Sequence, residues 1–197
     1  MAITINGGGT ITGVSVGGLP DGIVDTDMLA AGAVTAAKRG AGGILQVVSV
    51  SNNTAYTGTN TSYADVFSAS ITPAATSNKI LILAQLAISH EDNHTGLGRL
   101  VRQIGSGSFA AFHGGAGTQA NHADNVWWSV RNSIYGVSPY TVPYLDSPST
   151  TSAVTYKAQM ATSNSTYPWA VNRTAYSGNE LYLSPAASSI TLVEVAA

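Results

Sequence analysis

Two short segments of the sequence match motifs that carry hydrolytic chemistry in other proteins. Residues 13–17 (GVSVG) match the G-x-S-x-G pattern of a serine nucleophile elbow. That motif works because a strand turns sharply into a helix and lifts the serine above a parallel sheet. Ser15 instead lies in a glycine-rich segment with no helical pattern behind it. We therefore interpret residues 13–17 as part of a β arm and not as a catalytic site.

Residues 90–94 (HEDNH) match the H-E-x-x-H pattern of zinc proteases. The zinc site needs a helical turn, which places both imidazoles on one face. His90 and His94 follow an apolar strand pattern, so we predict an inter-strand loop with exposed histidines and no metal cofactor. A lesser alternative is a metal ion held on a symmetry axis by such histidines from several subunits, because His113 and His122 also lie in predicted loops of this region.

Trp127 and Trp128 form the most informative aromatic pair, because consecutive strand residues point to opposite faces of a sheet. One indole is expected to fill the core, while the other faces outward and either stacks on a sugar or fills a subunit interface. Tyr135 and Tyr140 follow in a loop-rich region and complete the candidate receptor-binding set. The scattered carboxylates argue against a glycosidase. No catalytic residues and no enzymatic activity are therefore predicted.

The composition favours a rigid all-β protein. Charged residues make up only 9% of the 197 residues, and neutral polar residues and glycine replace them. A net charge of −2 without a basic cluster argues against nucleic-acid binding. The sequence has no cysteine, no N-terminal secretory signal and no apolar run long enough to span a bilayer. We expect a protein that is made in a cytoplasm, leaves it by lysis or assembly, and does not insert into membranes.

Two segments precede the part of the chain with continuous β patterning. Residues 1–20 alternate around a triple glycine, which predicts a hairpin or an arm that adds to another sheet. Residues 21–43 partly repeat at a shift of ten and are too short to bury their apolar side chains alone. We predict an oligomerisation neck, with a helix on the surface of the chain's own domain as the alternative. The neck residues are Ile23, Val24, Met28, Leu29 and Val34.

From residue 44 to residue 197 the pattern is β throughout, with turn residues between the apolar segments. Residues 80–83 are apolar on both faces, as in a central strand between two layers. We predict an antiparallel jelly-roll-like β-sandwich. Its strands are expected at 44–50, 64–71, 78–89, 97–104, 108–112, 125–131, 152–161, 180–184 and 189–196.

Four stretches of the sequence together resemble fibre and appendage proteins of tailed bacteriophages. They are Thr26–Val48, Thr72–Ser89, Tyr144–Ala161 and Ser188–Ala197. In that family a short neck with an A-V-T-x-x-K pattern precedes a C-terminal β-domain that is often trimeric, and the last strand has the form I-T-L-x-E. The resemblance weakens between Glu91 and Pro139, and Lys38-Arg39 departs from the usual Lys-Leu of the neck. This middle region holds the histidines and the tryptophan pair, so the resemblance supplies no site residues.

The resemblance implies a homotrimeric tail fibre of the virion. Residues 1–20 would dock on other virion proteins of the tail, baseplate or capsid, residues 21–43 would set the three-fold axis, and the β-domain would bind host surface glycan. The alternative is a capsid decoration or head-fibre protein that caps or stabilises the shell. The two hypotheses differ in where the N-terminal arm docks.

Overall fold

The computed structural model describes residue 34 and residues 40–90, 94–112, 126–131, 133–176, 178 and 185–197. The chain divides into two units, Met1–Arg39 and Gly40–Ala197. The predicted arm and most of the predicted neck, including Ile23, Val24, Met28 and Leu29, lie outside the described residues. Val34 is half exposed. The account below concerns the second unit, called the β-domain.

The first sheet of the β-domain, sheet A, is built around one long strand, β4 (Lys79–His90). Along one edge, β4 pairs with β11 (Ser188–Val195) and, at its far end, with β10 (Trp169–Val171). β1 (Ile44–Asn52) extends the sheet beyond β11, and β2 (Tyr56–Gly58) extends it beyond β10. Along the other edge, β4 pairs with β8 (Ser138–Asp146).

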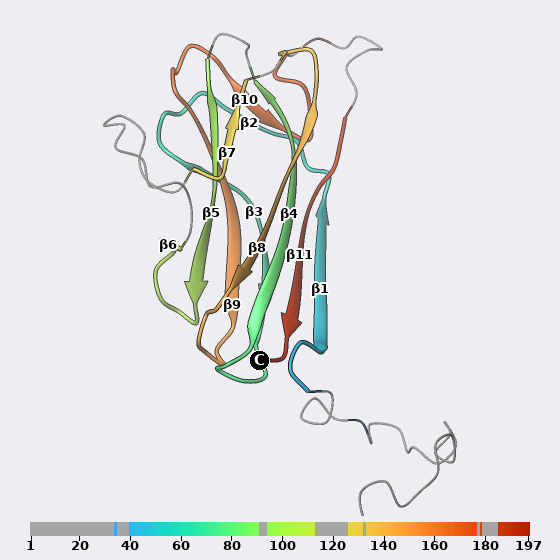
Figure 1. Ribbon diagram of the computed structural model, residues 1–197. Helices are drawn as coiled ribbons and strands as arrows, with labels where there is room; N and C mark the ends of the chain where they lie inside the picture. The colour runs from blue at the N-terminus through green and yellow to red at the C-terminus, as the bar shows by residue number, and fades with distance from the viewer. Residues whose placement is uncertain are drawn as a thin grey trace, which may run out of the picture. The chain divides into compact units, whose positions relative to one another are not determined.

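The second sheet, sheet B, has β9 (Val154–Thr162) between β3 (Ala64–Ile71) and β5 (Gly96–Ile104). The far edge of β5 carries two short strands, β6 (Ala110–Ala111) and β7 (Trp128–Val130). Every pairing in both sheets is antiparallel. The two sheets pack face to face as a sandwich (Figure 1). The predicted jelly-roll-like β-sandwich is confirmed.

The core lies between the sheets and follows the two-residue period of the strands. Ile80, Ile82 and Leu86 point inward from β4 and are fully buried, and they belong to the same cluster as Tyr156 and Met160 of β9. Burial of a side chain of this size stabilises the fold by about 1.5–3 kcal/mol. The strand pattern of the sequence therefore corresponds to one continuous core.

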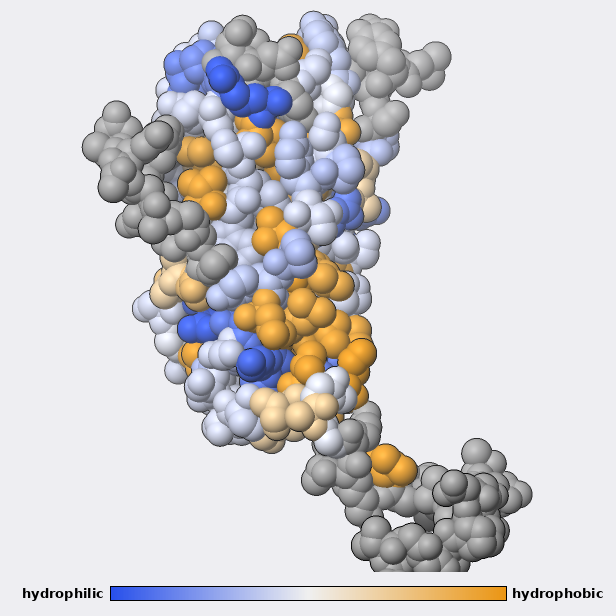
Figure 2. All heavy atoms as spheres, viewed as in Figure 1, coloured by the Kyte–Doolittle hydropathy of each residue, from blue (hydrophilic) through white to orange (hydrophobic). Residues whose placement is uncertain are grey.

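The outer face of sheet A differs from the expectation for residues 80–83. A central strand between two layers would have both faces covered, yet Leu83 is 39% exposed and Leu81 is half-buried. The space-filling view shows a hydrophobic patch on this face, over the lower parts of β4, β11 and β1 (Figure 2). β4 is thus central within its sheet, but its outward apolar side chains have no second layer of described residues over them.

Most predicted strands are present with boundaries within a few residues of those expected. The predicted segments 108–112 and 125–131 shorten to β6 and β7, and segment 180–184 lies outside the described residues. β2, β8 and β10 were not predicted. No described helix is long and apolar enough to cross a membrane.

Candidate functional site

Trp128 lies in the core, so the prediction that it binds a receptor is wrong for this structure. Its side chain is 3% exposed, and its ring packs on Gly98 of the paired strand β5. A Cβ atom at Gly98 would lie 2.7 Å from that ring. The glycine therefore creates the space in which the indole is buried.

Trp127 is half-buried at the open edge of the sandwich, beside β8. Its ring centroid lies 5.5 Å from that of Phe112 and 5.4 Å from that of Tyr144, which it meets edge-on. Phe112 also packs edge-on against Tyr156 at 5.4 Å. We call these four side chains the aromatic edge. The expectation that one indole fills the core is met by Trp128, whereas Trp127, which was expected to face outward, is half-buried and packs against the same core.

A partly buried ion pair lies beside the aromatic edge and connects the two sheets. Arg102 of β5 donates from Nη1 to both carboxylate oxygens of Asp146 on β8, at 2.8 Å each. The Tyr156 hydroxyl donates to the same carboxylate at 2.7 Å. Burial raises the pKa of Tyr156 strongly, and its hydrogen bond to Asp146 raises it further, so this hydroxyl stays protonated. The arrangement holds the two sheets together at the side where the aromatic residues gather.

A cavity of 180 Å³ opens next to this ion pair. Its lining includes Arg102 and Phe112, whose guanidinium carbon and ring centroid are 5.3 Å apart. A cavity with an aromatic wall and a fixed donor suits stacking and hydrogen bonding of a neutral polar ligand such as a sugar. The site is therefore suited to binding. The remaining lining residues are Ile104, Gly107, Ser108, Ala110 and Ala111.

The other two predicted receptor residues, Tyr135 and Tyr140, lie in the turn before β8 and near the start of β8. Tyr140 points inward and is half-buried, whereas Tyr135 is 48% exposed in the turn before the strand, with its ring 4.9 Å from Tyr176. Ser138 and Tyr144 are six residues apart on the strand, which corresponds to about 20 Å. The structure therefore does not bring Tyr135 together with Trp127.

His90 and His94 both contact other side chains of the β-domain. His90 is the last residue of β4 and is fully buried, with Nε2 3.0 Å from the Thr162 hydroxyl, so the prediction of an exposed loop histidine is wrong there. His94 stacks on Tyr167 with 3.8 Å between ring centroids. His113 and His122 lie outside the described residues. Within the described part of the chain, no three His, Cys, Asp or Glu side chains gather as metal ligands would.

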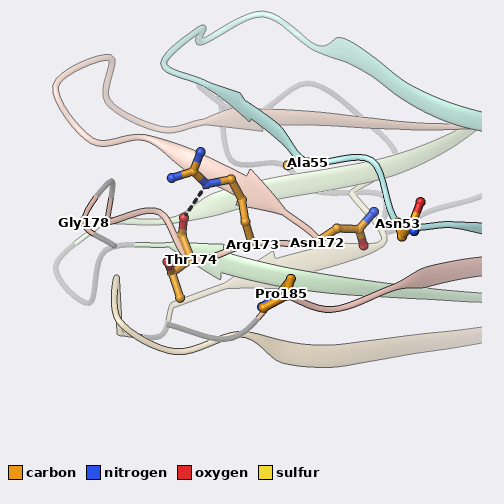
Figure 3. Close-up of a pocket in the computed structure, with 7 residues that line it drawn as sticks. All are labelled: Asn53, Ala55, Asn172, Arg173, Thr174, Gly178 and Pro185. Atoms are coloured by element: carbon orange, nitrogen blue, oxygen red, sulfur yellow. Dashed lines mark hydrogen bonds between the residues drawn. The ribbon is translucent and has the colours of Figure 1, made fainter. Parts of the chain in front are cut away.

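A polar pocket of 220 Å³ lies beside Asn172 and is lined also by Arg173 and Thr174 (Figure 3). Asn172 has a positive φ of 63°. Its Nδ2 donates to the carbonyls of Asn52 and Thr54, both at 2.9 Å. Its Oδ1 accepts a bond from the Ser188 hydroxyl. Asn172 therefore joins three chain segments, and its polar groups are already used in holding the fold.

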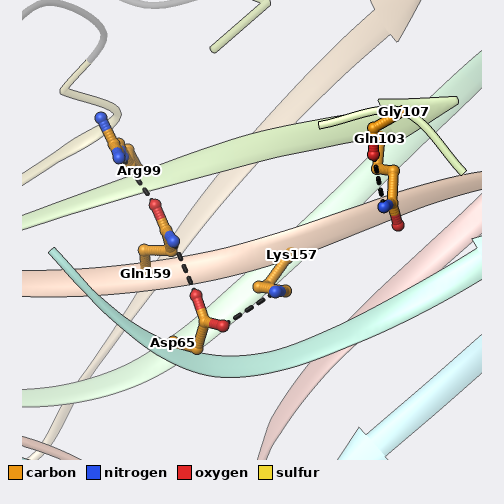
Figure 4. Close-up of polar contacts among 6 residues, drawn as sticks. All are labelled: Asp65, Arg99, Gln103, Gly107, Lys157 and Gln159. Atoms are coloured by element: carbon orange, nitrogen blue, oxygen red, sulfur yellow. Dashed lines mark hydrogen bonds and ion pairs between the residues drawn. The ribbon is translucent and has the colours of Figure 1, made fainter. Parts of the chain in front are cut away.

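The outer face of sheet B carries a chain of polar contacts across three strands (Figure 4). Arg99 donates to Gln159, Gln159 donates to Asp65, and Lys157 also donates to Asp65. The hydrogen bonds from Gln159 and Lys157 lower the pKa of Asp65. Arg99 also lies over the ring of Tyr63 at 4.0 Å. The residue types in the predicted strands allow this series of polar contacts. Only the register of the three strands reveals which residues meet.

No family model and no curated protein matches the sequence. Two solved structures share a distant likeness: the infectious bursal disease virus VP2 subviral particle, and the infectious bursal disease virus Gx strain. The first has 13% sequence identity and covers 77% of this chain and 37% of its own, with a TM-score of 0.34. The second has 16% identity and covers 77% of this chain and 40% of its own, also with a TM-score of 0.34. The chain spans about two fifths of these proteins, and values this low establish no functional relationship.

Proposed function

We propose that this chain is a bacteriophage virion structural protein, a homotrimeric tail fibre whose β-domain contacts glycan on the host surface. The sequence resemblance to phage fibre and appendage proteins motivates the proposal. The observation that carries it is the place of the resembling stretches in the fold.

Three of the four resembling stretches are far apart in the sequence but supply adjacent strands of sheet A. Thr26–Val48 ends in β1, Thr72–Ser89 contains most of β4, and Ser188–Ala197 contains β11. The stretch Tyr144–Ala161 begins with the last residues of β8. The sheet order β1-β11-β4 places the strands of three stretches side by side, and the fourth stretch adds the end of β8 on the other edge of β4 before it continues as β9 in sheet B. A shared framework of this kind supports the assignment to the appendage class better than separate matches would.

The region between Glu91 and Pro139, where the resemblance weakens, contributes β5, β6 and β7 and part of the aromatic edge. Variable surface beside a common framework is the arrangement expected of a receptor-binding domain. Trp127, Phe112 and Arg102 are the side chains that we assign to glycan contact. Three such sites per trimer and several trimers per virion would convert weak contacts into firm adhesion through effective concentration.

The proposal is tested by locating the protein on purified virions with antibodies against the β-domain and electron microscopy. Label along or at the tip of a tail appendage supports the tail-fibre assignment. Label over the shell would replace it with the capsid decoration or head-fibre alternative. Mature virions that contain none of the protein would overturn both.

A further inference from the structure

One continuous row of apolar side chains crosses the outer face of sheet A. The pairing registers place Val47, Val193, Leu81 and Leu145 side by side on β1, β11, β4 and β8. Val47 is 57% exposed and Leu145 is 47% exposed, whereas Leu81 is half-buried and Val193 is only 9% exposed. The next row holds Leu83 and Pro143 on β4 and β8, and the polar residues Ser49 and Thr191 on β1 and β11. We call this surface, completed by Ile44, Val195 and Pro143, the sheet A patch.

The sheet A patch lies at one end of the sheet and changes character along the strands. Beyond Leu83, the outward positions of the same strands are polar. They are Ser51, Ser189, Gln85 and Thr141, which are in register with one another. Among the described residues in register with the patch, Lys79 at its rim is charged. A face that is apolar at one end and polar at the other marks a defined area for contact, since exposed patches of this kind on soluble proteins are often interaction sites.

The apolar end is also where the chain enters the β-domain. The Gly42 N–H donates to the Ala196 carbonyl at 2.7 Å, and the Ala196 N–H donates to the Gly43 carbonyl at 2.9 Å. These bonds fix the start of β1 beside the end of β11. The 39 residues of the first unit, Met1–Arg39, therefore join each β-domain directly beside the first residue of its patch, Ile44.

We propose that the sheet A patch is covered by a second copy of this chain. If the preceding segment gathers copies around an axis, it brings the entry ends of the β-domains together, and these ends carry the patch. Around a three-fold axis the three patches can converge, so that each apolar row meets those of its neighbours without needing a groove. A strongly charged partner is disfavoured, because within residues 40–197, as far as the structure describes them, the outward positions in register with the patch offer it the single charge of Lys79. The inference rests on the proposed homotrimer and adds the surface through which the β-domains touch.

The test uses single-cysteine variants of the full chain, which has no cysteine of its own. Val47→Cys and Leu83→Cys place the thiol in the patch, and Ser68→Cys is the matched control on the exposed outer face of sheet B. Both patch residues are partly exposed in the monomer, so neither change opens the core. Each variant is checked by solution mass and thermal unfolding. It is then treated with a maleimide and, separately, with a flexible bismaleimide before denaturing electrophoresis.

The expected result is a trimer in which the two patch thiols react at least about tenfold more slowly than the control, as burial of the site in an assembly predicts. The bismaleimide should link chains through the patch thiols and not through residue 68. A trimer whose patch thiols react as fast as the control overturns the patch and leaves the homotrimer standing. Slow reaction without links between chains also overturns it, because the cover is then the chain's own N-terminal segment. A monomeric mass overturns both this inference and the homotrimer.

Discussion

At the scale of single residues, Glu194 is the most unusual group in the β-domain. It points inward from β11 and is fully buried. Gln46 and Asn78 each donate to its carboxylate at 2.6 Å, and the Ala74 N–H donates at 2.7 Å. A buried carboxylate is costly unless hydrogen bonds replace its hydration. These donors come from β1 and from the turn before β4, so the residue ties three segments together.

Glu194→Gln should lower the free energy of unfolding by about 2–4 kcal/mol at pH 7, because it places an amide donor against groups that also donate. Burial alone would raise the pKa of Glu194, but the three hydrogen bonds outweigh it and hold the pKa below its ordinary value of 4.5. As pH falls, the unfolded chain binds the proton first, so the stabilisation is complete above about pH 4.5 and is lost as pH falls through the folded pKa. Urea unfolding at pH 7 and pH 3 should show the difference between the two proteins shrinking in acid.

Asp65→Asn is the matched control for that measurement. Its carboxylate also has a lowered pKa, but the side chain is more than half exposed on the outer face of sheet B. Exposed pairs of this kind contribute about 1 kcal/mol or less. The role assigned to the buried carboxylate would be contradicted if Glu194→Gln lowered the free energy of unfolding no more than Asp65→Asn does. It would also be contradicted if the effect of Glu194→Gln were the same at both pH values.

Substitution of Trp127 and of Tyr135 tests which of these two predicted receptor residues contributes to adsorption. Trp127→Ala should weaken adsorption of the purified protein to host cells by at least about tenfold, or 1.4 kcal/mol, because aromatic anchors dominate binding surfaces. Tyr135→Ala changes an exposed aromatic residue in the turn before β8 and should leave adsorption unchanged. Thermal unfolding of both variants checks that the fold is retained. The opposite ranking would move the binding surface to the turn before β8.

At the scale of elements, the close contact between β5 and β7 depends on one missing side chain. A Cβ at Gly98 would lie 2.7 Å from the Trp128 ring and 3.0 Å from the Met160 sulfur. Gly98→Ala should therefore destabilise the β-domain by about 1–3 kcal/mol, the usual cost of overpacking a core. Gly136→Ala is the control, since its nearest contacts are at 3.9 Å and 4.0 Å. Denaturant unfolding gives the free energy of unfolding of both variants. Equal decreases in the two variants would show that the Trp128 ring moves aside freely.

The strands show what the sequence can and cannot predict. β3 and β4 were predicted nearly to the residue, because apolar residues and turn signals bound them clearly. β8 was missed because Pro139 and Pro143 read as strand breakers. The structure explains their presence: among the described strands, β8 pairs with β4 alone, and both prolines are exposed on the outer face of this edge strand. A missing N–H group is tolerated at an edge, but the sequence does not reveal which strand will be an edge.

The sequence also predicts the aromatic edge only in part. The alternation of strand residues correctly predicts that one of two adjacent tryptophans is buried. Which of the two is buried depends on the strand with which β7 pairs. Trp128 faces Gly98, and that contact selects it as the core residue. Arg102 and Asp146 could not be paired in advance, because β8 itself was not recognised. Local pattern therefore predicts the elements, whereas the composition of the site depends on register between distant segments.

At the scale of the whole molecule, the two units are expected to contribute separately to assembly. The β-domain has its own hydrophobic core, so a chain that begins at Gly40 should fold. If both the neck and the sheet A patch hold the trimer, loss of the neck removes the high effective concentration of neighbouring domains and leaves only the patch. The full chain should then be trimeric at all measurable concentrations, while the shortened chain associates only at high concentration.

Sedimentation of both proteins over a dilution series distinguishes the contributions. Val47→Asp in the shortened chain should abolish the remaining association, because burying an unpaired charge in an apolar contact is costly. The same substitution should leave its folding intact, since Val47 is more exposed than buried in the monomer. A shortened chain that is monomeric at every concentration would place assembly wholly in the neck. A shortened chain as firmly trimeric as the full chain would make residues 21–43 a linker, and the three-fold axis would then belong to the β-domain.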